Sequence, residues 1–236
     1  SSFHWGEPEV GYFLSQDEYV IRKDMSMLTD AGVDLIIFDV TNAVLYWDEW
    51  DVVLRTMAQM KKEGNKVPKF CFWAFNGNVI TVVHQLYDKF YQHKDLWFYW
   101  DGKPLLLYNA TPSVDANVGG GEKNFADYSD EVKQFFTLRN MWWGYYEWAG
   151  KRYVGTEGNW SFGLELNDER VRNMKPEERA ATWKGRYEQI SVTPAQHPMT
   201  MVGKSWSKES GEPAMDACDM PIKAKVPYLG GKECLD

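Results

Sequence analysis

Val33-Asp-Leu-Ile-Ile-Phe38 is a nearly continuous apolar run that ends at Asp39. An apolar run without alternation predicts a strand that is covered on both faces, as in a parallel sheet. A capping-box pattern, one apolar helical face and a terminating glycine come before it and predict a helix over 17–31: Ser15 with Glu18, then Ile21, Met25 and Leu28, then Gly32. The stretch therefore begins with a helix and continues as a buried strand.

The same cycle follows twice more along the chain. Asp48 begins a second amphipathic segment, which ends at Gly64-Asn65 and carries Trp50, Val53, Leu54 and Met57 on one face. Residues 67–75 form the next predicted strand. Asn76 begins a third predicted helix with Val79, Val83, Leu86 and Phe90 on one face. An Asp101-Gly102 turn then predicts a hairpin between 96–100 and 104–108.

The second half of the chain has a weaker pattern. A glycine-rich loop at Gly119–Gly121 precedes a predicted helix over 129–139 and a predicted strand over 141–146. Residues 147–175 are predicted as a long loop, 177–187 as a helix, 189–193 as a strand and 198–236 as an irregular segment. The five predicted parallel strands are 33–39, 67–75, 104–109, 141–146 and 189–193.

Strands that alternate with helices predict a parallel sheet, either open and doubly wound or closed into a barrel. We expect an α/β fold of the (β/α)8 TIM-barrel type, formed by one domain over 1–236. An eight-stranded barrel needs three more strands than the sequence shows, and no strand precedes the first helix. The barrel is therefore expected to be incomplete or irregular.

The composition excludes several classes of protein. A net charge of -8 disfavours nucleic-acid binding, which needs a basic surface. No run of about 18 apolar residues is present, so no membrane span is expected. Aromatic residues make up 16% of the chain, and their rings either stack on sugars or simply fill the core. Cys71 lies in an apolar strand and is expected to be a buried thiol, whereas a disulfide between Cys218 and Cys234 is possible but not required.

Common cofactor and metal motifs are absent from the sequence. There is no phosphate-binding Gly-x-x-x-x-Gly-Lys, no Gly-x-Gly-x-x-Gly between strand and helix, and no Gly-x-Ser-x-Gly elbow. The four histidines lack zinc-ligand spacing. We therefore expect no cofactor and no metal. Carboxylates and aromatic rings remain, which are the groups that glycoside hydrolysis uses.

Polar residues follow each predicted strand, where ligands of α/β folds bind. Each also has a structural explanation as a helix cap, a turn residue or a packed loop residue. The strand-end residues are Asp39, Asn42, Asn76, Asn109, Glu147, Gln196 and His197. The aromatic residues near them that are candidates for stacking walls are Tyr46, Trp47, Trp73, Tyr146, Trp148 and Trp160.

Several sequence blocks resemble bacterial glycoside-hydrolase-like proteins of the family 71/99-like group. The blocks are His4-Trp-Gly-Glu-Pro8, Gly11-Tyr12, Tyr19-Val-Ile-Arg-Lys23, Asp30-Ala-Gly-Val-Asp34, Phe38-Asp-Val-Thr-Asn42, Asp95-Leu-Trp-Phe98, Gly102-Lys-Pro-Leu105, Gln189-Ile-Ser-Val192 and Ala195-Gln-His-Pro198. The resemblance covers most of residues 3–205 and implies a (β/α) barrel, export from the cell and polysaccharide degradation. The first barrel strand and the C-terminal Trp-Asn-Glu-Trp motif of related chains are absent here, and Glu147-Trp148 comes too early to be that motif.

The predicted function is therefore that of a glycoside hydrolase located in the periplasm, on the cell surface or outside the cell. Asp39 and Glu147 are the predicted catalytic carboxylates, and the apolar neighbours of Glu147 would favour the protonated form that a general acid needs. The predicted substrate-binding residues are His4, Trp5, Glu7, Asn42, Tyr46, Trp73, Asn76, Asn109, Trp148, Gln196 and His197. The alternatives are a glycan-binding relative that has lost a catalytic acid and a phosphosugar enzyme with an anion site at a helix N-terminus.

Overall fold

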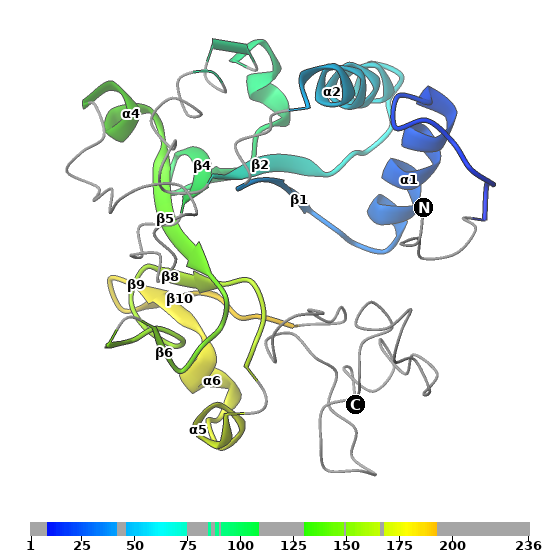
Figure 1. Cartoon of the computed structure of the whole chain (residues 1–236). Coiled ribbons are helices and arrows are strands. Elements are labelled where there is room, and N and C mark those ends of the chain that lie inside the picture. The colour runs from blue at the N-terminus through cyan, green and yellow to red at the C-terminus, as the bar shows by residue number, and fades with distance from the viewer. Residues whose placement is uncertain are drawn as a thin grey trace. The chain divides into compact units, whose positions relative to one another are not determined.

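The computed structural model describes residues 9–41, 46–74, 85, 88–89, 91–108, 130–148, 150–165 and 168–192 (Figure 1). It divides into two compact units, an N-terminal unit that ends at Arg139 and a C-terminal unit that begins at Asn140. Three predictions fall wholly or mostly outside the described residues: the helix that begins at Asn76, the glycine-rich loop and the segment 198–236.

Helix α1 (Glu18–Asp30) begins at Asp17, whose side chain accepts hydrogen bonds from the N–H groups of Tyr19 and Val20 at 2.9 and 3.4 Å. The predicted cap at Ser15 is therefore wrong, because Asp17 satisfies the free N–H groups of the first turn. The predicted end is confirmed. Gly32 has a φ of 81°, and the Gly32 N–H donates to Thr29 in a glycine-terminated helix end.

Helix α2 (Trp47–Lys62) begins at Tyr46, whose φ is 37° and whose side chain makes no capping bond. Asp48 therefore lies inside the first turn instead of capping the helix, where its charge still favours the positive end of the helix dipole. The end at Gly64-Asn65 is confirmed, because Gly64 donates to Lys61 at 3.1 Å and Asn65 to Met60 at 3.0 Å.

The main sheet has the strand order β1-β2-β4-β5-β8. Its strands are β1 (Leu35–Val40), β2 (Lys69–Ala74), β4 (Lys103–Tyr108), β5 (Thr137–Trp142) and β8 (Asn159–Ser161). The pairs β1–β2, β2–β4 and β5–β8 are parallel. The predicted α/β class is confirmed. The strand order ends at β1 and β8, so the described strands do not close into a barrel.

The predicted hairpin is also confirmed. Strand β3 (Tyr99–Trp100) pairs antiparallel with β4, and it follows the 3-10 helix η1 (Tyr91–Leu96). Asp101 and Gly102 between the strands have φ values of 50° and 80°. Two successive positive φ values match the twist of the flanking strands, which explains why Asp-Gly is found here.

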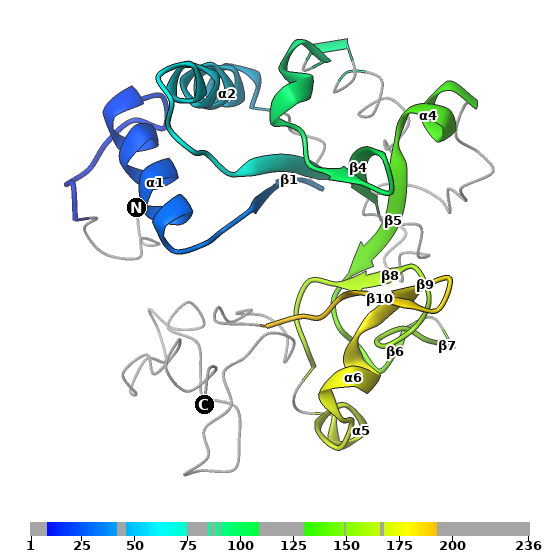
Figure 2. The ribbon, with the colours of Figure 1, turned by 180° about the vertical axis from the view of Figure 1, so that it is seen from behind.

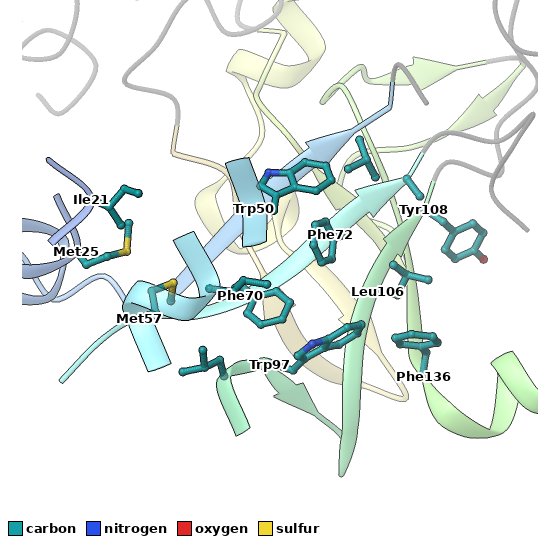
Figure 3. Close-up of a cluster of buried hydrophobic side chains, with 14 of the residues drawn as sticks. Ile21, Met25, Trp50, Met57, Phe70, Phe72, Trp97, Leu106, Tyr108 and Phe136 are labelled. Carbon is teal, nitrogen blue, oxygen red and sulfur yellow. The ribbon is translucent and has the colours of Figure 1, made fainter. Parts of the chain in front are cut away.

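The core of the N-terminal unit lies between the sheet and its helices (Figure 3). Phe70 and Phe72 of β2 are fully buried, and the ring of Trp50 from α2 lies 5.1 Å from that of Phe72. Leu54 and Met57 follow on the same helical face and have no exposed surface. Burial of each such side chain contributes about 1.5–3 kcal/mol, so this layer holds α2 on the sheet.

The second half of the chain differs more from the sequence predictions. The predicted helix over 129–139 is only α4 (Asp130–Phe135), and the strand predicted over 141–146 is β5, four residues earlier. The predicted loop over 147–175 contains an antiparallel pair of β6 (Glu147–Trp148) and β7 (Lys151–Arg152). Strand β8 and helix α5 (Glu169–Arg172) lie in the same stretch.

The predictions for 177–187 and 189–193 are wrong. Helix α6 (Pro176–Arg179) is short, and an antiparallel hairpin of β9 (Ala181–Trp183) and β10 (Arg186–Gln189) follows it (Figure 2). Lys184 and Gly185 have φ values of 49° and 76°, which turn the chain between these strands. The fifth parallel strand is therefore β8. No helix in the described part of the chain is long and apolar enough to cross a membrane.

Candidate functional site

The carboxyl ends of β1 and β2 place Asp39 beside Trp73 as register partners. The Asp39 side chain is exposed, and its Oδ1 accepts a hydrogen bond from the N–H of Thr41 at 2.8 Å. This local turn fixes the carboxylate at the edge of the sheet where ligands of parallel α/β folds bind. Within the described residues no cation pairs with it, so Asp39 is available as an acceptor or base.

Aromatic residues near this edge differ in their exposure. Trp73 is only 3% exposed, whereas Tyr46 is 50% exposed and contacts the ring of Trp50 edge-on at 6.0 Å. A buried ring has no free face for a ligand, so Tyr46 is the better stacking surface of the two. Tyr108 ends β4 at the same edge, and burial raises the pKa of its hydroxyl, an effect that the nearby Arg139 guanidinium opposes.

Glu147 lies in β6, five residues beyond the end of β5, and not directly after a parallel strand. Its side chain is 52% exposed, and its Oε2 lies 3.8 Å from a guanidinium nitrogen of Arg170. Arg170 also binds Asp168, with a shortest distance of 2.6 Å. The surroundings of Glu147 are therefore charged and solvated, in contrast to the apolar environment that was predicted for a general acid.

Tyr146 contacts two cations in the same cluster. The guanidinium carbons of Arg152 and Arg170 each lie 4.3 Å from the centre of its ring. Arg152 also donates to the Tyr146 hydroxyl at 3.0 Å and to the carbonyl of Val154 at 2.9 Å. Cation–π contacts of this kind hold the β6–β7 pair against α5. The ring of Tyr146, which was predicted to stack on a ligand, therefore contacts two arginine side chains of the protein.

Glu165 is half-buried, whereas Glu147 is exposed. Burial, followed by the nearby Asp168 carboxylate, raises the pKa of Glu165, while Arg170 and a hydrogen bond from the backbone of Tyr146 oppose this rise. Its own N–H donates to the carbonyl of Gly144 at 3.0 Å, which attaches it to the segment that follows β5. A carboxyl group with a raised pKa keeps its proton to a higher pH than an ordinary glutamate does, which suits it to proton donation. Sequence pattern alone did not distinguish Glu165 from other loop carboxylates.

The other predicted aromatic residues of the C-terminal unit are largely engaged. Trp160 is 5% exposed, and its Nε1 donates to Glu188 at 3.1 Å. Trp148 stacks on Tyr145 with a centroid distance of 4.9 Å and an interplanar angle of 15°. The ring of Trp142 lies 5.8 Å from that of Trp148. These contacts indicate a packed aromatic cluster.

The remaining predicted binding residues lie outside the described part of the chain. They are His4, Trp5, Glu7, Asn42, Asn76, Asn109, Gln196 and His197. Asp39 belongs to the N-terminal unit and Glu147 and Glu165 to the C-terminal unit, so each carboxyl group is described within its own unit. The described residues contain no group of three His, Cys, Asp or Glu side chains that could hold a metal ion.

Comparison with known proteins gives a distant likeness only. No protein-family model matches the chain, and no curated protein matches it. Among solved structures, the GH99 endo-α-mannosidase from Bacteroides thetaiotaomicron is 18% identical with a TM-score of 0.41, over 57% of this chain and 40% of that one. A glycoside hydrolase-like protein is 14% identical with the same TM-score, over 59% and 47%. The chain spans less than half of either structure.

Proposed function

We propose that this chain acts on a polysaccharide or oligosaccharide as a glycoside hydrolase outside the cytoplasm. The observation that carries this proposal is the exposed carboxylate of Asp39 at the carboxyl edge of a parallel sheet, with the exposed ring of Tyr46 at the start of the following helix. The Phe38-Asp-Val-Thr-Asn42 block that contains this carboxylate is also one of the blocks that resemble glycoside-hydrolase-like proteins.

Hydrolysis of a glycosidic bond needs two carboxyl groups, one that donates a proton and one that acts as base or nucleophile. In our proposal Asp39 is the base or nucleophile, since its carboxylate is exposed and is held in place by the Thr41 N–H. Among the carboxyl groups described within the C-terminal unit, Glu165 is better suited than Glu147 to donate a proton, because burial raises the pKa of Glu165.

A second candidate function is glycan binding without hydrolysis. The contact between Glu147 and Arg170 favours it, because this predicted catalytic carboxylate is engaged by a guanidinium in the described structure. Two carboxyl groups about 5 to 9.5 Å apart across a bound sugar support hydrolysis, whereas a single one supports binding.

The test is a screen of the purified chain against soluble plant, algal and host polysaccharides, with chromatographic analysis of the products. Release of shorter oligosaccharides from at least one polysaccharide is the expected result. Retention of a polysaccharide without any product assigns the chain to glycan binding. If the chain neither binds nor cleaves any polysaccharide of the panel, the proposed function is wrong.

A further inference from the structure

Backbone hydrogen bonds join the segments that follow β5 and β8 at their carboxyl ends. Phe162 donates to the carbonyl of Trp142 at 2.7 Å, and Glu165 donates to the carbonyl of Gly144 at 3.0 Å. A Cβ atom on Gly144 would lie 1.7 Å from the carbonyl oxygen of Gly163. The two backbones are therefore in direct contact, which gives the neighbouring side chains a rigid base.

Trp143 and Phe162 project from this base as a pair. Their ring centres lie 4.7 Å apart and their planes are at 80°, so one ring meets the other edge-on. Phe162 is 47% exposed and Trp143 is half-buried. Edge-on packing of two rings is favourable in itself and holds both in place. The result is an aromatic corner that is partly open to solvent.

The position of this corner indicates what it binds. It lies at the carboxyl end of two parallel strands, which is the ligand-binding edge of α/β folds. Glu165 follows Phe162 by three residues and offers a half-buried carboxyl group. Sugars present apolar C–H faces to aromatic rings and hydroxyl groups to carboxyl groups. The net charge of -8 disfavours a strongly anionic glycan.

We propose that Trp143 and Phe162 form a subsite that binds one pyranose ring of a neutral glycan, with Glu165 as a hydrogen-bonding partner. The inference rests on the proposed function and adds a place and a substrate class to it. It also replaces the predicted stacking walls Trp73 and Trp160, whose rings are buried.

The test is affinity electrophoresis of the full chain through gels that contain a galactomannan, a xyloglucan, a dextran or a starch. We expect Phe162→Ala and Trp143→Ala to weaken retention on the polysaccharide that holds the wild type by on the order of tenfold in Kd. Phe162→Leu, which keeps apolar bulk but loses the flat face, is expected to weaken it to a similar extent. Trp143→Phe keeps an aromatic ring, so it is expected to retain most of the wild-type affinity that Trp143→Ala loses. Tyr187→Ala is the control, because Tyr187 is 68% exposed on β10.

Far-UV circular dichroism and thermal melting establish that each variant is folded. Unchanged retention of folded Phe162→Ala and Phe162→Leu would overturn the subsite while leaving the proposed function standing. A change of oligomeric state in Phe162→Ala, measured by light scattering, without a change in retention would also overturn it, by assigning the corner to a protein contact. A wild-type chain that is retained by none of the four gels and cleaves none of the polysaccharides overturns the proposed function and the subsite together.

Discussion

Asp39 and Trp73 are register partners in the parallel pair β1–β2, and each stands one residue before the end of its strand. Trp73 is buried and Asp39 is exposed, so the pair marks the point where the packed sheet meets solvent. We expect Asp39→Asn to reduce turnover about a hundredfold or more, because the amide cannot act as base or nucleophile. Product release from a cleaved polysaccharide measures this effect.

Asp39→Asn removes the carboxylate but is expected to leave the local structure intact. An asparagine at position 39 keeps a side-chain oxygen that accepts the Thr41 N–H, so the turn at the end of β1 is expected to survive. Asp34→Asn is the matched control, since Asp34 is exposed and directly precedes β1 at its other end. Turnover close to that of the wild type in folded Asp39→Asn would leave Asp39 with the role of a turn residue.

Glu165 is expected to make stability depend on pH. Its pKa is raised in the folded chain, mainly by burial, so the folded state holds this proton more tightly than the unfolded state does. The resulting stability is fully present below the ordinary glutamate pKa and is lost as the pH rises through the raised pKa. Glu165→Gln removes this dependence, because the amide does not titrate.

Urea midpoints of the wild type and Glu165→Gln, measured from pH 4 to pH 8, test this expectation. The wild type is expected to lose stability relative to the variant as the pH rises through this range. Glu157→Gln is the control, because Glu157 is exposed in the same unit. Parallel pH profiles of the wild type and Glu165→Gln would contradict the prediction.

The first half of the fold was predictable because its signals are local. Gly32 and Gly64 end helices at positive φ, and Asp101-Gly102 turns a hairpin at two positive φ values. Between these points long apolar runs specify buried strands. Each of these features needs only neighbouring residues to be recognised.

The second half was harder because its strands are short and depend on distant partners. Strand β8 has three residues and no apolar run, and it is stabilised by its pairing with β5. Residues 177–187 resemble a helix in composition, yet Lys184-Gly185 adopts a positive-φ turn that forms a hairpin instead. The environment of Glu165 depends on Asp168, Arg170 and Tyr146 together. Local propensity does not contain this information.

Phe72→Ala is expected to destabilise the chain by about 3–5 kcal/mol, because the fully buried ring would leave a cavity between β2 and α2. Urea denaturation followed by tryptophan fluorescence measures this change. Tyr19→Ala is the control on α1, where the ring is 70% exposed, and we expect a change within about 0.5 kcal/mol. Equal effects of the two substitutions would contradict the packing described for this core.

Cys71 is expected to resist alkylation in the folded chain. It has no exposed surface, and burial raises the pKa of its thiol well above the usual range, so the reactive thiolate is scarce. The test uses a Cys218→Ser/Cys234→Ser variant, in which Cys71 is the remaining thiol. We expect iodoacetamide to modify Cys71 in native buffer only as fast as the chain unfolds, and to modify it rapidly in urea. Rapid labelling without denaturant would show that the strand opens locally.

Gly144→Ala is expected to destabilise the C-terminal unit through lack of space. The added Cβ would lie 1.7 Å from the Gly163 carbonyl oxygen and 3.0 Å from the Leu164 Cα, and backbone atoms cannot move aside as a side chain does. Overpacking of this kind costs about 1–3 kcal/mol or more. Gly102→Ala is the contrasting variant, because nothing lies within 4 Å of its added Cβ and only its φ of 80° opposes an alanine, at a cost of about 1–2 kcal/mol.

Since Gly144 lies beside Trp143, we expect Gly144→Ala, unlike Gly102→Ala, also to weaken retention in polysaccharide gels. Wild-type stability and retention in Gly144→Ala would show that the two segments separate easily and give the aromatic corner no rigid base.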